Sequence, residues 1–265
     1  MKKPDVATFE RIVGIQVLPP GYAGKIRCLF STRRTSTGGA ALDFDHRKGD
    51  NPAVGESYEA AAGWFGVPAS SVFVMRQVHG GDVTVIREIP EPPRMRAAIS
   101  VDATVTDRPG LVLTVLTADC LPILMADRKK NVVAAVHAGW RSTAAGIAQR
   151  AVTTMADVFG SRPGDIFAAL GPCIGRCCYE VGPEVLRDVR EAFPFGDDHV
   201  EAKPDGKGML DLAGLNRGAL VRAGLSPDHI WTADLCTYCR EDLFYSYRRE
   251  GEGTGRMLAG IMIEE

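Results

Sequence analysis

The sequence has no long hydrophobic run and no block of charge of one sign. No stretch of its 265 residues is long and apolar enough to span a bilayer. The 31 basic and 33 acidic residues are mixed along the chain and give a net charge of −2, so nothing favours a nucleic-acid groove or a membrane-surface role. Residues 1–15 carry charges that interrupt any apolar core, so no signal peptide is expected.

Disulfides are also not expected. The seven cysteines are an odd number, and without an export signal they indicate reduced thiols in a cytoplasm. Neither an internal repeat nor a low-complexity segment divides the chain, and the 45% hydrophobic content suffices for a full core. We therefore expect one cytoplasmic domain over residues 1–265.

Short apolar runs rich in β-branched residues predict a strand-rich fold. Strands are predicted at 25–32, 71–78, 82–87, 102–106, 111–117, 122–126, 132–137, 165–170, 229–234 and 257–263. The glycine pair at 80–81 predicts a hairpin between the second and third of these.

Helical periodicity is clearest after residue 141. Ser142 or Thr143 is the expected N-cap of a helix that Gly160 closes, and further helices are predicted at 183–193 and 211–223. Consecutive strands with interspersed helices indicate an α+β fold, with mixed β-sheets sandwiched by helices.

Three soft metal-ligand side chains stand at the ends of predicted buried strands. His79, Cys120 and His137 are each followed within two residues by Gly or Pro. Two imidazoles and one thiolate fill three of the four positions of a tetrahedral metal and leave one open, which is typical of a catalytic zinc site. They lie too far apart in sequence for a finger-type motif, so only the fold can bring them together.

The same residues allow a reaction without a metal. Cys120 as a thiolate nucleophile, with His79 or His137 as base, would make a cysteine hydrolase or amidase. A protein that only binds a small molecule is a third reading, although an open thiolate–imidazole site suits passive binding poorly.

A second metal site can be drawn from other cysteines. Cys173, Cys177 and Cys178 in one loop and Cys236 and Cys239 in another could supply thiolates to a structural zinc. Their spacings do not form two Cys-x-x-Cys knuckles, however, and a free cysteine is often just a small buried hydrophobe.

Several ordered motifs resemble one known family, the laccase-domain family. They are QVHG (77–80), DATVT (102–106), TADCLP (117–122), VHAGWR (136–141), GPCI (171–174), YEV (179–181) and FYSYRR (244–249). The resemblance runs from about residue 30 to 263. It implies an α+β sandwich related to the catalytic domain of cytotoxic necrotising factor toxins, and it implies that His79, Cys120 and His137 bind zinc or copper.

Members of that family are described as polyphenol oxidases, as purine nucleoside phosphorylases with adenosine deaminase activity, and as peptidoglycan editing factors. A multicopper oxidase needs several coppers held largely by imidazoles. Five histidines and no His-x-His pair allow only a single copper here. We therefore expect a zinc-dependent purine nucleoside phosphorylase, with adenosine deaminase as a second activity. An amidase that edits peptidoglycan precursors and a single-copper polyphenol oxidase are the alternatives.

The expected partners are a purine nucleoside and phosphate. Arg33, Arg141 and Arg249 are the candidate phosphate donors, although each could instead be a surface ion-pair partner. Gln77 could orient the base or the ribose. Asp119 could serve as acid or base in deamination, or could merely hydrogen-bond its own turn; neither candidate histidine begins the His-x-Glu motif of known zinc deaminases.

Overall fold

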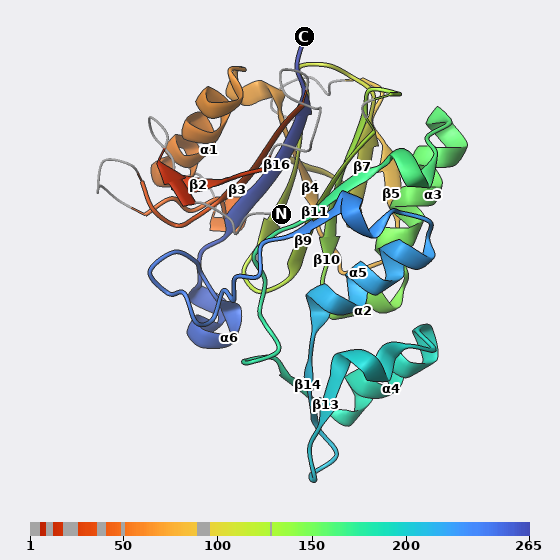
Figure 1. Ribbon diagram of the computed structural model, residues 1–265. Coiled ribbons are helices and arrows are strands. Elements are labelled where there is room, and N and C mark those ends of the chain that lie inside the picture. The colour runs from red at the N-terminus through yellow and green to blue at the C-terminus, as the bar shows by residue number, and fades with distance from the viewer. Residues whose placement is uncertain are drawn as a thin grey trace.

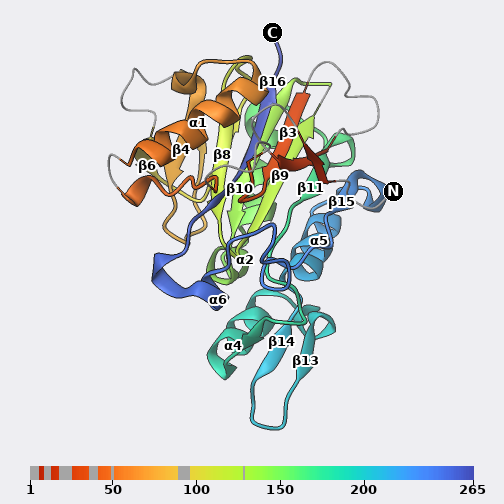
Figure 2. The ribbon, with the colours of Figure 1, turned by 90° about the vertical axis from the view of Figure 1, so that its left-hand side faces the viewer.

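The computed structural model describes residues 6–8, 13–17, 26–35, 41–48, 51–88, 96–127 and 129–265. In this part of the chain two large β-sheets stack face to face, and helices cover the outer face of each (Figures 1 and 2). The layers follow the order helix, sheet, sheet, helix. This architecture confirms the predicted α+β class, whereas the relation to the toxin domain stays a prediction.

The first sheet has seven strands in the described residues. Their order is β1 (Val6–Thr8), β2 (Val13–Gln16), β3 (Ile26–Ser31), β16 (Met257–Ile263), β8 (Val112–Thr117), β4 (Val72–Arg76) and β6 (Arg96–Ser100). β4 runs parallel to β6 and β8, and the other pairs are antiparallel.

The second sheet has six strands in the same part of the chain. Their order is β15 (Ile230–Thr232), β11 (Phe167–Leu170), β9 (Leu121–Asp127), β10 (Val132–Ala138), β7 (Ala103–Thr106) and β5 (Val83–Val85). The two edge pairs are parallel and the central pairs antiparallel, so both sheets are mixed.

The main core lies between the sheets. In β3, Cys28 and Phe30 point into this core while Leu29 points to the outer face. Successive side chains of a strand alternate between faces. Because both faces of each sheet are covered, the central strands are apolar almost throughout, and this explains the strand-length apolar runs of the sequence.

Helices close the two outer faces. α1 (Pro52–Phe65) packs on the first sheet, while α3 (Ile147–Phe159) and α5 (Leu212–Arg222) lie on the second (Figures 1 and 2). Asn51 caps the start of α1 and Asp211 that of α5 through side-chain hydrogen bonds. Short 3₁₀ helices complete this part of the chain: His46–Lys48, Ala69–Ser71, Pro163–Asp165, Gly196–His199, Pro227–His229 and Gly251–Gly253.

A small antiparallel sheet lies at one end of the molecule. It contains β12 (Glu180–Val181), β14 (Gly208–Leu210) and β13 (Val200–Ala202), with α4 (Pro183–Ala192) packed beside it (Figure 2). The short helices α2 (Trp140–Ala144) and α6 (Tyr247–Glu250) lie at the same end of the large sheets (Figure 1).

The predicted hairpin across residues 80–81 is wrong. β4 belongs to the first sheet, whereas β5 belongs to the second and pairs there with β7. The chain changes sheets at His79, whose φ of 59° lies in the left-handed region. The turn is held by the carboxylate of Asp102, which accepts hydrogen bonds from three successive backbone N–H groups.

The predicted start of the helix after residue 141 is also wrong. Gly139 is the N-cap of α2, and Gly146 (φ 75°) breaks the helix before α3 begins at Ile147. The hydroxyl of Thr143 does not cap a helix, because it accepts a buried hydrogen bond from Asn216 of α5. Gly160 ends α3 in the left-handed conformation, as predicted.

Candidate metal centre

His79, Cys120 and His137 come together at one end of the two sheets. Cys120 directly precedes β9, and the antiparallel register pairs His137 of β10 with Pro122, so thiol and imidazole stand at the same strand ends. His79 arrives from the first sheet. The three ligand atoms lie within 4.8 Å of one another, and Cys120 Sγ is 3.9 Å from His79 Nε2. The fold therefore supplies the proximity that the sequence spacing could not.

One buried carboxylate holds two of these residues, His137 through its ring and His79 through its backbone. Asp102 Oδ1 lies 2.8 Å from His137 Nδ1 and also accepts the backbone N–H of His79 at 2.9 Å. Burial raises the pKa of Asp102, but the hydrogen bonds from His137 and from the backbone N–H groups outweigh burial and lower the pKa. A carboxylate behind a histidine is the usual outer partner of a metal-ligating imidazole, and it leaves Nε2 free to bind the metal.

The backbone around the centre is tightly constrained. His79 and Asp119, with φ of 59° and 93°, adopt conformations that cost about 1–3 kcal/mol for a non-glycine residue and often mark functional sites. A Cβ at Gly139 would lie 3.1 Å from Cys120 Sγ and 3.2 Å from His79 Cδ2. A side chain at this position would push Cys120 and His79 away from their present places.

The electrostatics favour an ionised thiol. Burial raises the pKa of Cys120, but the charge of His137 and hydrogen bonds from His137 and His79 lower it to about 6. Burial lowers the pKa of His137, yet the charge of Cys120 and the hydrogen bond to Asp102 raise it to about 9. In the metal-free protein, Cys120 and His137 thus form a thiolate–imidazolium pair at neutral pH.

This donor set fits a soft divalent or monovalent metal. Two imidazoles and a thiolate suit zinc or copper, and His79 is exposed while His137 is buried, so the group opens to one side. This arrangement has three candidate ligands, the Asp102 carboxylate hydrogen-bonded to one of them, and one open side. It is typical of a catalytic rather than a purely structural metal centre.

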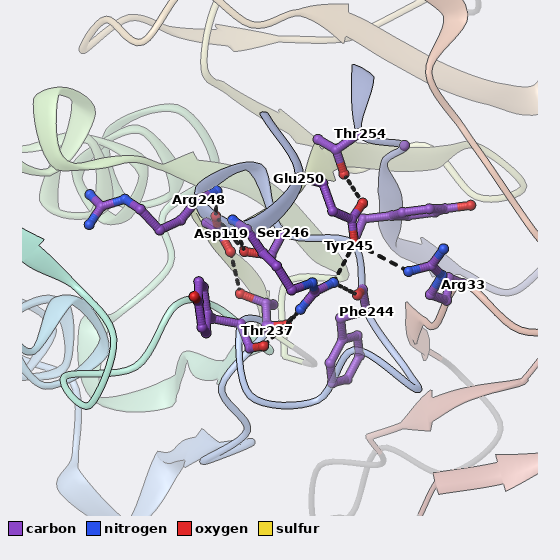
Figure 3. A network of polar contacts seen from close by, with 12 residues as sticks. Arg33, Asp119, Thr237, Phe244, Tyr245, Ser246, Arg248, Glu250 and Thr254 are labelled. Atoms are coloured by element: carbon purple, nitrogen blue, oxygen red, sulfur yellow. Dashed lines mark hydrogen bonds and ion pairs between the residues drawn. The ribbon is translucent and has the colours of Figure 1, made fainter. Parts of the chain in front are cut away.

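Asp119, next to Cys120, holds the surrounding loops. Its carboxylate accepts hydrogen bonds from the hydroxyls of Thr237 (2.6 Å) and Ser246 (3.0 Å) and from the backbone N–H of Arg248 (2.7 Å) (Figure 3). All three donors belong to the C-terminal part of the chain. Asp119 therefore ties the Cys120 turn to the α6 region.

Two of the predicted phosphate donors belong to this same network. Arg249 donates to the carbonyl oxygens of Thr237, Tyr238 and Phe244. The guanidinium of Arg33 stacks 4.3 Å from the ring of Tyr245 and forms an ion pair with Glu250 (Figure 3). Neither arginine is among the described residues that line the adjoining pocket.

The centre opens into a cavity of about 860 Å³. This volume is in the range of small-molecule sites. In the described part of the chain, its lining includes arginine and aromatic side chains around the metal ligands: Arg47, Arg76, Trp140, Arg141, Tyr179, Tyr247, Arg248 and Arg256.

The other two predicted binding residues do line this pocket. Arg141 is exposed there and stacks 4.2 Å from the ring of Trp140. The side-chain amide of Gln77 forms two hydrogen bonds of 2.8 Å with the backbone of Leu116. Gln77 thus extends the pairing between the β4 end and β8, and it positions the turn that carries His79.

Sequence reasoning assigned no role to Asp102, Arg47 or Arg256. Asp102 stands directly before a buried strand and inside one of the quoted motifs, and this was the available signal. Arg47 and Arg256 lie in unremarkable polar segments, and only the fold brings them together. Burial and the positive charge of Arg47 lower the pKa of Arg256, and both side chains line the same cavity.

None of the helices in the described ranges is long and apolar enough to cross a membrane.

The purine nucleoside phosphorylase YlmD of Geobacillus stearothermophilus is 33% identical to this chain over 267 residues, which cover 97% of each chain. Its crystal structure matches with a TM-score of 0.90 at 32% identity, over 99% of this chain and 100% of that chain. The adenosine deaminase RL5, from an unknown prokaryotic organism, is 38% identical over 201 residues, 74% of this chain and 76% of its own length.

A family model described as multi-copper polyphenol oxidoreductase laccase matches residues 27–264. The quoted motifs lie within this range. Because sequence and structure match over nearly the whole chain, this protein belongs to that laccase-like family, as the resemblance of its motifs predicted.

Proposed function

We propose that this protein is a zinc-dependent purine nucleoside phosphorylase, with adenosine deamination as a second activity. The observation that carries the proposal is the His79–Cys120–His137 group at a cavity large enough for a nucleoside and phosphate, whose wall is rich in arginine. Relatives of 33% and 40% identity, from Geobacillus stearothermophilus and Deinococcus radiodurans, bear the name purine nucleoside phosphorylase.

The metal would be held by His79, Cys120 and His137, and Asp102 would accept a hydrogen bond from Nδ1 of His137. A zinc ion held there would supply Lewis acidity at the open side of the group. The protein's own contribution is geometric, because Asp102 fixes both the His137 ring and the His79 backbone before any ligand arrives. Such preorganisation costs no rearrangement during the reaction.

Phosphate would be bound by guanidinium groups of the cavity wall. Arg256 donates to the carbonyl oxygens of Thr254 and Gly255, and Arg47 lies near enough to lower its pKa, while Asp45 pairs with Arg47 through contacts of 2.7 and 2.8 Å. Arg141, exposed on the same wall, is the third candidate donor.

The purine base would stack on aromatic side chains. Trp140, Tyr179 and Tyr247 line the same cavity as the metal ligands. Aromatic faces bind any purine with little dependence on its exocyclic group. We therefore expect adenosine and inosine to be accepted in a similar way.

Deamination requires a proton carrier near the metal. Asp119 is the nearest sequence neighbour of a ligand, but three hydrogen bonds from Thr237, Ser246 and Arg248 occupy its carboxylate. These contacts favour a positioning role for Asp119. The His-x-Glu sequence that the chain does contain, His199 to Glu201, lies outside the described lining of the cavity.

A cysteine amidase is the second candidate. Cys120, His137 and Asp102 form a chain of thiolate, imidazolium and carboxylate, which is the order of a nucleophile, its base and the group that orients the base. In this mechanism a bound metal would block the thiolate. A single-copper oxidase would use the same three ligands, so metal content decides between all three.

The test uses protein stripped of metal under reducing conditions and then reloaded with zinc or with copper. Each form is incubated with inosine, adenosine and phosphate, with a phenol and with a peptide amide, and the products are identified. We expect ribose 1-phosphate and free base from the zinc form, and little product from the stripped form or from His79→Ala. The matched control is His229→Ala, an exposed histidine outside the described lining of the cavity, which keeps activity.

Amide cleavage by the stripped protein, without ribose 1-phosphate from the zinc form, would replace the phosphorylase proposal with the amidase. Phenol oxidation by the copper form alone would replace it with the oxidase. Either result would leave the geometry of the centre unchanged but assign it a different reaction.

A further inference from the structure

Four other cysteines meet on two loops beside the cavity. Cys177 and Cys178 lie between β11 and β12, and Cys236 and Cys239 lie between β15 and α6. Their sulfur atoms all lie within 4.8 Å of one another. Cys239 Sγ is 3.4 Å from Cys178 Sγ and 3.7 Å from Cys177 Sγ.

Cys173 does not join this cluster. The sequence grouped it with the other four, but it is buried in the core, and its backbone forms a parallel bridge with that of Cys236. The bridge brings the two loops side by side and thereby places the four remaining sulfur atoms together.

The distances suit one tetrahedral ion. Zinc–sulfur bonds of about 2.3 Å in a tetrahedron put neighbouring sulfur atoms about 3.8 Å apart. The distances of 3.4 and 3.7 Å from Cys239 Sγ to the other two sulfur atoms lie near this value. A single disulfide would use two of the four thiols and leave the other two exposed or half-buried at the surface, where free thiols are open to oxidation.

The backbone is also arranged around the sulfur atoms. The N–H of Gly175 donates to Cys236 Sγ at 3.3 Å, as backbone amides do toward thiolates. A Cβ at Gly175 would lie 3.2 Å from Cys236 Cβ and 3.4 Å from Cys177 Sγ. A glycine at this position lets the first loop approach the second closely enough to share an ion.

We propose that Cys177, Cys178, Cys236 and Cys239 bind a structural zinc ion through four thiolates. Binding releases the four thiol protons to solvent and forms four zinc–sulfur bonds, with no change of oxidation state. Four protein ligands leave no open position, so this site holds structure and does not take part in catalysis.

The ion would clamp one wall of the cavity. The second loop carries Thr237, whose hydroxyl donates to Asp119 (Figure 3). The carbonyl oxygen of Thr237 accepts a hydrogen bond from the guanidinium of Arg249. The first loop leads into Tyr179, which lines the cavity. Zinc at the four cysteines would therefore fix the network that holds the Cys120 turn.

The experiment measures zinc per chain by elemental mass spectrometry after purification in reductant and dialysis against buffer with trace zinc. We compare wild type with Cys239→Ser, Cys177→Ser and Cys120→Ser, and with Cys173→Ser as the control from the same loop. We expect Cys239→Ser and Cys177→Ser each to bind about one zinc fewer than wild type, and Cys173→Ser to bind as much as wild type.

The two candidate sites are counted separately. Cys120→Ser tests the His79–Cys120–His137 group, so a zinc that persists in Cys120→Ser and is lost in Cys239→Ser belongs to the four-cysteine site whatever the fate of the proposed phosphorylase. If Cys239→Ser does not fold, cobalt-loaded Cys120→Ser gives the readout, because a tetrathiolate produces strong visible absorption.

Equal zinc in wild type and in both cluster variants would overturn the proposal. A disulfide between two of the four cysteines, detected in the purified protein by a mass lower by two hydrogens, would do the same.

Discussion

Asp102 connects the candidate ligands at the scale of single residues. Its side chain is fully buried, and it accepts hydrogen bonds from His137 and from three consecutive backbone N–H groups. These hydrogen bonds offset the free-energy cost of burying a charged carboxylate. The sequence identified the three candidate ligands, because Cys and His at strand ends have recognisable chemistry. The sequence did not predict the role of Asp102, because buried or exposed carboxylates serve many purposes. Only its contacts in the folded chain show that Asp102 holds His79 and His137.

Replacing Asp102 by Asn should weaken metal binding by about 10- to 100-fold, because the imidazole of His137 loses its charged partner. The measurement is zinc affinity by competition with a chromophoric chelator. Asp127→Asn is the matched control, since Asp127 is as buried as Asp102 and also accepts hydrogen bonds from backbone N–H groups. It lies at the end of β9 that is remote from Cys120. Unchanged affinity in Asp102→Asn would contradict the orienting role.

Replacing Gly139 by Ala should abolish metal binding while the fold persists. The backbone at Gly139 is extended, with φ of −70°, so alanine fits its conformation, but the added Cβ would contact Cys120 Sγ and His79 Cδ2. Gly63→Ala is the control, because a Cβ there meets nothing within 4 Å. Zinc content and circular dichroism of both variants check the prediction, and full zinc content in Gly139→Ala would refute it.

Metal affinity should rise with pH between about 7 and 8.5. Over this range Cys120, with a pKa of about 6, is already a thiolate, whereas His137, with a pKa of about 9, carries a proton that the metal must displace. One displaced proton corresponds to about a tenfold gain in affinity per pH unit. Calorimetry in buffers of different ionisation enthalpy measures the released proton, and an affinity independent of pH would argue against the ion pair.

At the scale of elements, the positions of the strands in the sequence are easier to predict than the pairing of the strands in the sheets. Apolar runs located the central strands within a few residues, because both faces of those strands are buried. The pairing of β4 and β5 could not be predicted, since the Asp102 carboxylate that turns the chain at 78–80 lies more than twenty residues away. α1 was missed although Asn51 and Gly66 mark its ends, because small residues and two glycines obscure its apolar face.

The contact between α2 and α5 rests on a buried polar pair. Asn216 donates to Thr143 Oγ1 at 2.9 Å. Thr143→Val keeps the side-chain shape but leaves the buried amide without this acceptor, so the free energy of unfolding should fall by about 1–3 kcal/mol. Urea denaturation measures the change. Thr153→Val on the exposed face of α3 should change it by less than about 0.5 kcal/mol, and equal effects of the two substitutions would contradict the assignment.

At the scale of the whole molecule, the two stacked sheets explain why distant segments share one centre. His79 comes from the first sheet and Cys120 and His137 from the second, so the centre forms only where the ends of both sheets meet. Residues of α2, α5 and α6 at that end then line the cavity. The fold class could be predicted from sequence, and the three candidate ligands could be named from it. The arginines of the cavity could not, because Arg47 and Arg256 become neighbours only in the folded chain.

The central claim is that this cavity joins phosphate to the ribose of a purine nucleoside. The most direct measurement follows oxygen-labelled phosphate through the reaction of the zinc-loaded protein with inosine. We expect ribose 1-phosphate that carries the label in its C1 oxygen, formed in equal amount with hypoxanthine and lost in Cys120→Ser. Unlabelled ribose, or labelled product formed equally well by Cys120→Ser, would contradict it.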